Sequence, residues 1–169
     1  MSEIRESILN VRSALASNPD AGPAPDRPAV AVMEEGLRSR VEGGDGWAVV
    51  TDMPAPVGGG APAPSPAWLV RAALASCAAT AIAMRAAELD ITLTRLEVTA
   101  ESETDMRGLL AAGNGVDPGP AIARLRVDLA ADEANEQQLE ELVRWADSHS
   151  PVCDVLRRTV PLELEITAG

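Results

Sequence analysis

Two cysteines, Cys77 and Cys153, are the side chains of this 169-residue sequence that are best suited to chemistry. A thiolate is a nucleophile, and a peroxide oxidises it to a sulfenic acid that a second thiol converts to a disulfide. Two cysteines are too few for a disulfide framework and match no zinc spacing, and with a single histidine we expect no metal site. The opposing interpretation is that Cys77 is a small buried hydrophobe, a common role for free cysteine.

The segment from Ser65 to Asp90 predicts a long α-helix around Cys77, because good helix formers follow Pro66 without another proline or any glycine. Charges fall on one stripe, and Cys77 lies about 120° from Arg71 at 3.6 residues per turn. The thiol is therefore expected on the apolar side. The predicted members of that side are Ala73, Leu74, Ser76, Thr80, Ala81 and Met84. The uncharged stretch is too short to span a bilayer and fits a core helix, so we expect no membrane partner.

Cys153 follows a Ser-Pro pair that predicts the start of a short helix, with Ser150 as N-cap and Pro151 as first residue. Cys153 then lies in the first turn, where the helix N-terminus is expected to lower its pKa. His149 precedes this start. It could act as a base near a thiol, although capping of a helix C-terminus is the commoner role.

The remaining segments alternate between helix and strand patterns. An amphipathic helix is predicted over residues 3–17, with Ser2 as N-cap, and is expected to dock on the body of the protein or on a second copy. A proline-rich linker follows. Strand patterns cover residues 29–52, as a hairpin or three-stranded meander, and then residues 91–103, 122–129 and 160–166. Loops are predicted over residues 53–66 and 106–120. A second helix is predicted to begin at Asp132, and its apolar face consists of Leu139, Leu142, Val143 and Ala146.

This order predicts an α+β fold in which antiparallel sheets pack on the long helix. We expect an N-terminal helix and linker over residues 1–28 and one domain over residues 29–169, a length that buries a core without disulfides.

The charge balance argues against several partners. The chain carries 26 acidic against 14 basic residues, for a net charge of −12, and has three tryptophans as its only aromatic side chains besides one histidine. Nucleic acid is therefore not an expected partner. Gly58-Gly59-Gly60 lacks the lysine and hydroxyl of a phosphate loop, so we expect no nucleotide and no other cofactor. The N-terminus has no signal-like apolar segment, which predicts a cytoplasmic protein whose disulfides are transient.

Four stretches together resemble the OsmC/Ohr family of osmotically inducible and organic hydroperoxide resistance proteins. They are GGGAPAPSP, LVRAALASC, VDPGPAIARLRVDL and SPVCDVLRRTVPLELEI, and the likeness covers about residues 36–167. The resemblance implies an intertwined homodimer with the reactive cysteine at the interface. It also implies that Cys77 is a peroxidatic thiolate that reduces organic hydroperoxides under oxidative stress, that a second cysteine resolves its sulfenic acid, and that a dithiol reductant regenerates the protein.

The sequence departs from the peroxidatic pattern of this family at three places. Ser65-Pro66-Ala67 replaces Asn-Pro-Glu, and residues 47–65 contain no arginine, which leaves Arg38, Arg40 or Arg71 as possible activators of the thiol. The usual second cysteine stands immediately before proline, where this chain has Ser150, and Cys153 lies three residues later. From the resemblance we expect a peroxidase that uses Cys77, with Cys153 as the displaced resolving cysteine. The alternative is a non-catalytic relative that binds a small hydrophobic ligand at the dimer interface.

Overall fold

The computed structural model of the chain describes residues 3–169, so the predicted cap Ser2 lies outside the described part. The chain forms two compact units, each described here by itself. One comprises residues 6–73, and the other comprises residues 74–169 with the first residues of the chain. The predicted N-terminal helix is confirmed as α1 (Glu3–Ser17), none of whose described residues is buried.

The three-stranded meander predicted for residues 29–52 is confirmed. Antiparallel strands β1 (Ala29–Met33), β2 (Ser39–Gly43) and β3 (Ala48–Thr51) pair in sequence order. The glycine-rich turn between the last two strands places Gly46 at a φ of 78°, a left-handed conformation that glycine adopts without strain.

The loop after this sheet is held by Asp52, which is 3% exposed. Its carboxylate accepts hydrogen bonds from the backbone N–H groups of Met53 at 2.7 Å and Gly60 at 3.0 Å. A Cβ on Gly59 would lie 1.7 Å from the Met53 carbonyl oxygen, so this position admits only glycine. The glycines therefore allow a tight backbone fold that leads into the long helix.

The long helix is confirmed as α2 (Pro66–Glu88), but of the predicted inner face only Leu74 is fully buried. The buried stripe consists of residues spaced four apart: Leu74, Ala78, Ile82 and Ala86. The predicted inner residues Ala73, Ser76, Thr80 and Met84 are exposed, and Cys77 is half-buried beside the stripe. By length and composition alone α2 could also span a membrane. Its stripe instead belongs to the core of the protein.

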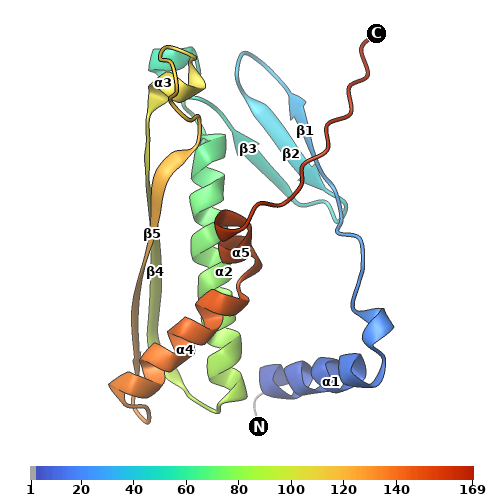
Figure 1. Ribbon diagram of the computed structural model, residues 1–169, viewed down its shortest axis with the longest axis vertical. Helices are drawn as coiled ribbons and strands as arrows, with labels where there is room; N and C mark the ends of the chain where they lie inside the picture. Colours follow the sequence, from blue (N-terminus) through green and yellow to red (C-terminus); the bar gives the residue numbers. More distant parts are fainter. Residues whose placement is uncertain (1–2) are drawn as a thin grey trace. The chain divides into compact units, whose positions relative to one another are not determined.

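Strands β4 (Leu93–Thr104) and β5 (Pro120–Ala131) form an antiparallel ribbon beside α2 (Figure 1). The inner face of the ribbon packs on the core through Leu93, Leu96, Val98, Val127 and Leu129. Its exposed side chains form cross-strand ion pairs, including Arg95–Asp128 and Arg126–Glu101. The connection was predicted as a loop but contains the short helix α3 (Met106–Leu109).

Helices α4 (Glu136–His149) and α5 (Pro151–Arg157) follow the ribbon. The predicted start of α4 at Asp132 is four residues early, because a reciprocal capping box between Asn135 and Gln138 fixes the N-terminus. Leu142 and Ala146 lie in the core with Ile82 and Ala86 of α2, as the apolar face predicted. The predicted start of α5 at Ser150-Pro151 is confirmed.

The predicted final strand over residues 160–166 is wrong for the single chain. This segment pairs with no other strand, and Leu162, Leu164 and Ile166 are 94%, 81% and 79% exposed. Alternating apolar residues give an extended segment one apolar face, but the strand forms only where the edge of another strand offers hydrogen bonds. The sequence pattern carried no information about that edge.

Leu142→Ala should lower the free energy of unfolding by about 2–5 kcal/mol, because Leu142 is 1% exposed and its loss opens a cavity in the core. Urea denaturation followed by circular dichroism measures this change. Leu110→Ala, at a site that is 58% exposed, is the matched control and should cost less than about 1 kcal/mol. Equal effects of the two substitutions would contradict the assigned core.

Candidate thiol site

The Ser150 hydroxyl links the two cysteines. Its Oγ donates a hydrogen bond to Cys77 Sγ at 3.2 Å and accepts one from the Cys153 backbone N–H at 3.3 Å. The second bond is the N-cap of α5, and Ser150 is 1% exposed. A serine hydroxyl has one proton and two acceptor lone pairs, so it can accept the cap bond and donate to the sulfur at the same time.

Cys77 is the more accessible of the two thiols. It lies on α2, one residue before Ala78 of the buried stripe, and is half-buried. Its sulfur accepts the hydrogen bond from the Ser150 hydroxyl, which places a donor directly at this atom. The site thus combines access for a small reactant with a fixed donor to the nucleophilic atom.

Cys153 lies in the opposite environment. It is 3% exposed, and burial raises its pKa, with the nearby Asp147 carboxylate acting in the same direction. The hydrogen bond with Ser150 and the charge of Arg157 lower the pKa but do not offset burial. The prediction that the helix N-terminus lowers the pKa of Cys153 is therefore wrong, because burial is the larger effect. At neutral pH Cys153 is held as a thiol.

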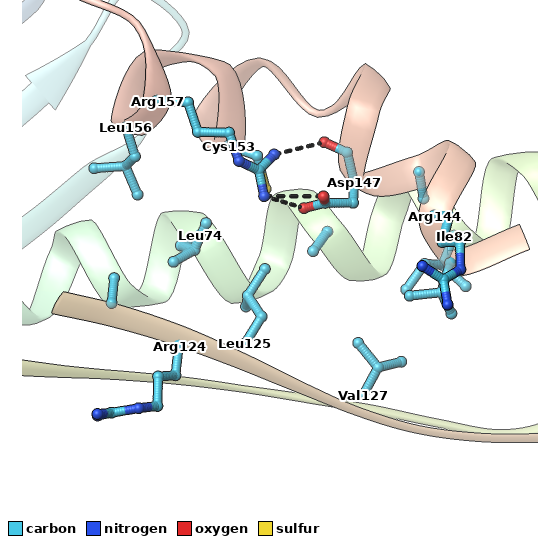
Figure 2. A pocket seen from close by; sticks show the side chains of 14 residues that line it. Leu74, Ile82, Arg124, Leu125, Val127, Arg144, Asp147, Cys153, Leu156 and Arg157 are labelled. Atoms are coloured by element: carbon cyan, nitrogen blue, oxygen red, sulfur yellow. Dashed lines mark hydrogen bonds and ion pairs between the residues drawn. The ribbon is translucent and has the colours of Figure 1, made fainter. Parts of the chain in front are cut away.

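Asp147 and Arg157 join the ends of α4 and α5 next to this thiol (Figure 2). The Arg157 guanidinium donates to both carboxylate oxygens of Asp147, at 2.8 and 2.9 Å, and to its backbone carbonyl at 3.3 Å. The hydrogen bond with Asp147 raises the pKa of Arg157, which stays charged. Sequence reasoning missed this pair, because its ten-residue spacing spans two helices and follows no helical or strand period.

A cavity of about 480 Å³ lies between α2, β5 and the two C-terminal helices. Its lining is mainly apolar and includes Leu74, Ala78, Ile82, Leu125, Val127, Val143 and Leu156; its polar lining comes from Arg124, Arg144, Asp147 and Arg157. Cys153 also lines this cavity, and Figure 2 shows its sulfur beside the Arg157 guanidinium. Cys77 is not among the lining residues, so the cavity faces the second thiol.

The other predicted candidates lie in different surroundings. His149 takes the role of a helix C-terminal residue: Nδ1 lies 2.8 Å from the Trp145 carbonyl, and its ring stacks on Trp145 at 4.1 Å. Arg38 pairs with Glu34, and Arg40 pairs with Glu42. Arg71 donates to the Ala67 carbonyl at 3.3 Å. Within residues 3–169, no group of three or more metal-ligating side chains comes together.

Known proteins place this architecture in one class. The family model described as OsmC-like protein matches residues 58–165, most of the chain, and the chain belongs to this family. The resemblance drawn from the sequence motifs is thereby confirmed. No curated protein matches the chain.

Solved structures agree with this assignment. The organic hydroperoxide resistance protein OsmC of Legionella pneumophila is 25% identical, with a TM-score of 0.57 and coverage of 80% of this chain and 91% of its own. The OsmC-like protein of Mycoplasma pneumoniae is 15% identical, with a TM-score of 0.69 and coverage of 81% and 91%. OhrB of Bacillus subtilis is 20% identical, with a TM-score of 0.53 and coverage of 85% and 98%. The last two show the shared α+β fold.

Ser150→Ala should slow alkylation of Cys77 by iodoacetamide at neutral pH about tenfold or more, since a hydrogen bond to a charged group contributes about 1.5–3 kcal/mol. Mass spectrometry of the Cys77 peptide measures the rate. Loss of the cap should also cost about 1 kcal/mol of stability.

Ser148→Ala is the matched control, because that hydroxyl is bonded to the Trp145 carbonyl. It should leave the alkylation rate unchanged. A Ser150→Ala protein that is folded and alkylates at the unaltered rate would contradict the role assigned to this hydroxyl.

Proposed function

We propose that the chain is a thiol-dependent peroxidase that reduces small organic hydroperoxides through Cys77. The observation that carries this proposal is the hydrogen bond from Ser150 Oγ to the half-buried Cys77 Sγ. The relative from Legionella pneumophila, an organic hydroperoxide resistance protein at 25% identity, supports the substrate class.

In this reaction the Cys77 thiolate attacks one oxygen of the hydroperoxide. A sulfur–oxygen bond forms, the O–O bond breaks, and the alkoxide leaves with the electron pair and takes up a proton to become an alcohol. Cys77 is oxidised to a sulfenic acid. The donor from Ser150 stabilises the attacking thiolate before the reaction, which is where a thiol peroxidase needs it.

Cys153 is the proposed resolving thiol. Its backbone is tied to the same hydroxyl that contacts Cys77, so the two residues are neighbours in the folded chain. Burial keeps Cys153 protonated and poorly reactive toward peroxide in the resting protein. It therefore does not compete for the substrate, and its thiol is preserved for the second step. A dithiol reductant would then restore both cysteines.

A second candidate function is non-catalytic binding of a small hydrophobic ligand. The cavity beside Cys153 favours it, because a space of about 480 Å³ with a mainly apolar lining suits such a molecule. In this case Cys77 would be a structural side chain, and peroxide would leave the protein unchanged.

We also propose that the protein acts as a cytoplasmic homodimer. The support is the segment over residues 160–166, whose alternating apolar side chains are exposed in the single chain. Such a segment is stabilised when it adds to a sheet edge, and a second copy offers one.

Reduced protein should lose two thiols per chain when one equivalent of cumene hydroperoxide is added, because one thiol is oxidised and the other resolves it. Titration with a thiol reagent measures the loss. Cys77→Ser should abolish it, whereas Cys153→Ser should leave a sulfenic acid on Cys77 that dimedone traps. An unchanged thiol titre under excess peroxide would leave only the ligand-binding function.

The full chain should have a sedimentation mass of twice the 17.6 kDa of one chain. Leu162→Asp combined with Leu164→Asp should shift the dimer–monomer equilibrium toward the monomer. The reason is that charged side chains do not pack on the apolar face of a sheet. Sedimentation velocity over a range of concentrations measures the mass. Ala168→Asp, beyond the apolar pattern, is the control. A wild-type monomer at every concentration would contradict the dimer.

A further inference from the structure

The pair formed by Asp147 and Arg157 has no part in the first step of the proposed reaction, yet it lies directly at the second thiol. Asp147 comes from the last turn of α4, and Cys153 and Arg157 come from α5. All three line one cavity (Figure 2). A guanidinium, a carboxylate and a thiol in one cavity lining form a site at which a proton can be transferred.

Disulfide formation requires that a proton leave Cys153. A thiol attacks sulfur only as its thiolate, and burial raises the pKa of Cys153. The Asp147 carboxylate lines the same cavity as this thiol and contributes to the rise of its pKa. Resolution therefore needs a proton acceptor at this place, and a carboxylate is already there.

We propose that Asp147 accepts the proton of Cys153 as this thiol attacks oxidised Cys77, and that Arg157 is the positioning residue that orients the carboxylate. The proposal rests on the proposed peroxidase function. Arg157 holds both carboxylate oxygens and the backbone carbonyl of the same residue, so the carboxylate plane is fixed relative to α5. A fixed base meets the geometric requirement of general base catalysis.

The step balances as follows. Cys153 Sγ gives its proton to Asp147 and its electron pair to the sulfur of the Cys77 sulfenic acid. The S–S bond forms, the S–O bond of Cys77 breaks, and the oxygen leaves with its electron pair and is protonated to water. In this step the Cys153 sulfur is oxidised from thiol to disulfide, and the Cys77 sulfur is reduced from sulfenic acid to disulfide. Asp147 is 40% exposed at its side chain and returns its proton to solvent.

The test separates two roles of Asp147 by the sign of its effect. As a charge alone, Asp147 raises the pKa of Cys153, so Asp147→Asn would increase the thiolate fraction and speed disulfide formation. As a base, it assists the step, and Asp147→Asn would slow disulfide formation about tenfold or more. The full-length reduced protein receives one equivalent of cumene hydroperoxide. Acid quenching and mass spectrometry then give the rates of sulfenic acid and disulfide formation.

For Asp147→Asn we expect sulfenic acid to form at the wild-type rate and to accumulate as a dimedone adduct. The wild-type disulfide rate should depend less steeply on pH than the rate of Asp147→Asn, because the Asp147 carboxylate rather than solvent takes the proton. In Asp147→Asn the rate should rise about tenfold per pH unit, because solvent must then remove the proton. A structural role would leave the pH dependence unchanged.

Two controls test whether loss of charge or of the ion pair explains the effect. Asp154→Asn removes an acid from α5 that pairs with Arg158 instead, and should leave the disulfide rate unchanged. Arg157→Gln removes the group that orients the carboxylate but keeps the base, so it should slow disulfide formation less than Asp147→Asn does and leave the pH dependence of the wild type. An unchanged disulfide rate in Arg157→Gln would overturn the positioning role, and the steep pH dependence of Asp147→Asn in this variant would overturn the assignment of Asp147 as the base.

Failure of this inference is distinguishable from failure of the proposed function. If wild-type protein forms neither sulfenic acid nor disulfide, the peroxidase function fails and the inference falls with it. If sulfenic acid forms, and Asp147→Asn resolves it at the wild-type rate or faster, only the inference is overturned. Slower resolution with the altered pH dependence supports it.

Discussion

The thiol site depends on one buried hydroxyl. Ser150 caps α5 and contacts Cys77 of α2, so a single side chain fixes the junction of α4 and α5 against the central helix. A buried hydroxyl must have its hydrogen bonds satisfied, and any shift of α5 relative to α2 would break one of them. The position of Cys77 relative to the second thiol is therefore set by the same interaction that starts a helix.

The two thiols share this hydroxyl but differ in what surrounds them. Cys77 receives the donated proton and is half-buried, whereas Cys153 contributes only its backbone and is enclosed beside a carboxylate. Burial raises the pKa of Cys153, whereas Cys77 is more open to solvent and accepts a hydrogen bond from Ser150. The difference would suit the proposed reaction, in which Cys77 meets the oxidant and Cys153 stays reduced until the second step.

Local signals explain what the sequence predicted well. The Ser150-Pro151 cap, the run of helix formers around Cys77 and the alternation in β4 and β5 each depend on neighbouring residues, and each is confirmed. The failures depend on distant partners. Burial reversed the expected pKa shift of Cys153, the Asp147–Arg157 pair joins two helices, and the segment over residues 160–166 lacks an edge to pair with. Periodicity carries no information about any of these.

The displaced second cysteine has a physical consequence. In the family pattern that the sequence resembles, the resolving cysteine stands immediately before the proline, and its sulfur becomes part of the disulfide. Here that place holds the Ser150 oxygen, 3.2 Å from Cys77 Sγ, and the second cysteine lies in the first turn of α5. In the proposed reaction the Ser150 donor would therefore not be consumed when the two cysteines form a disulfide. After reduction the serine would contact the Cys77 sulfur again, so the proposal assigns activation of Cys77 and resolution of its sulfenic acid to different residues.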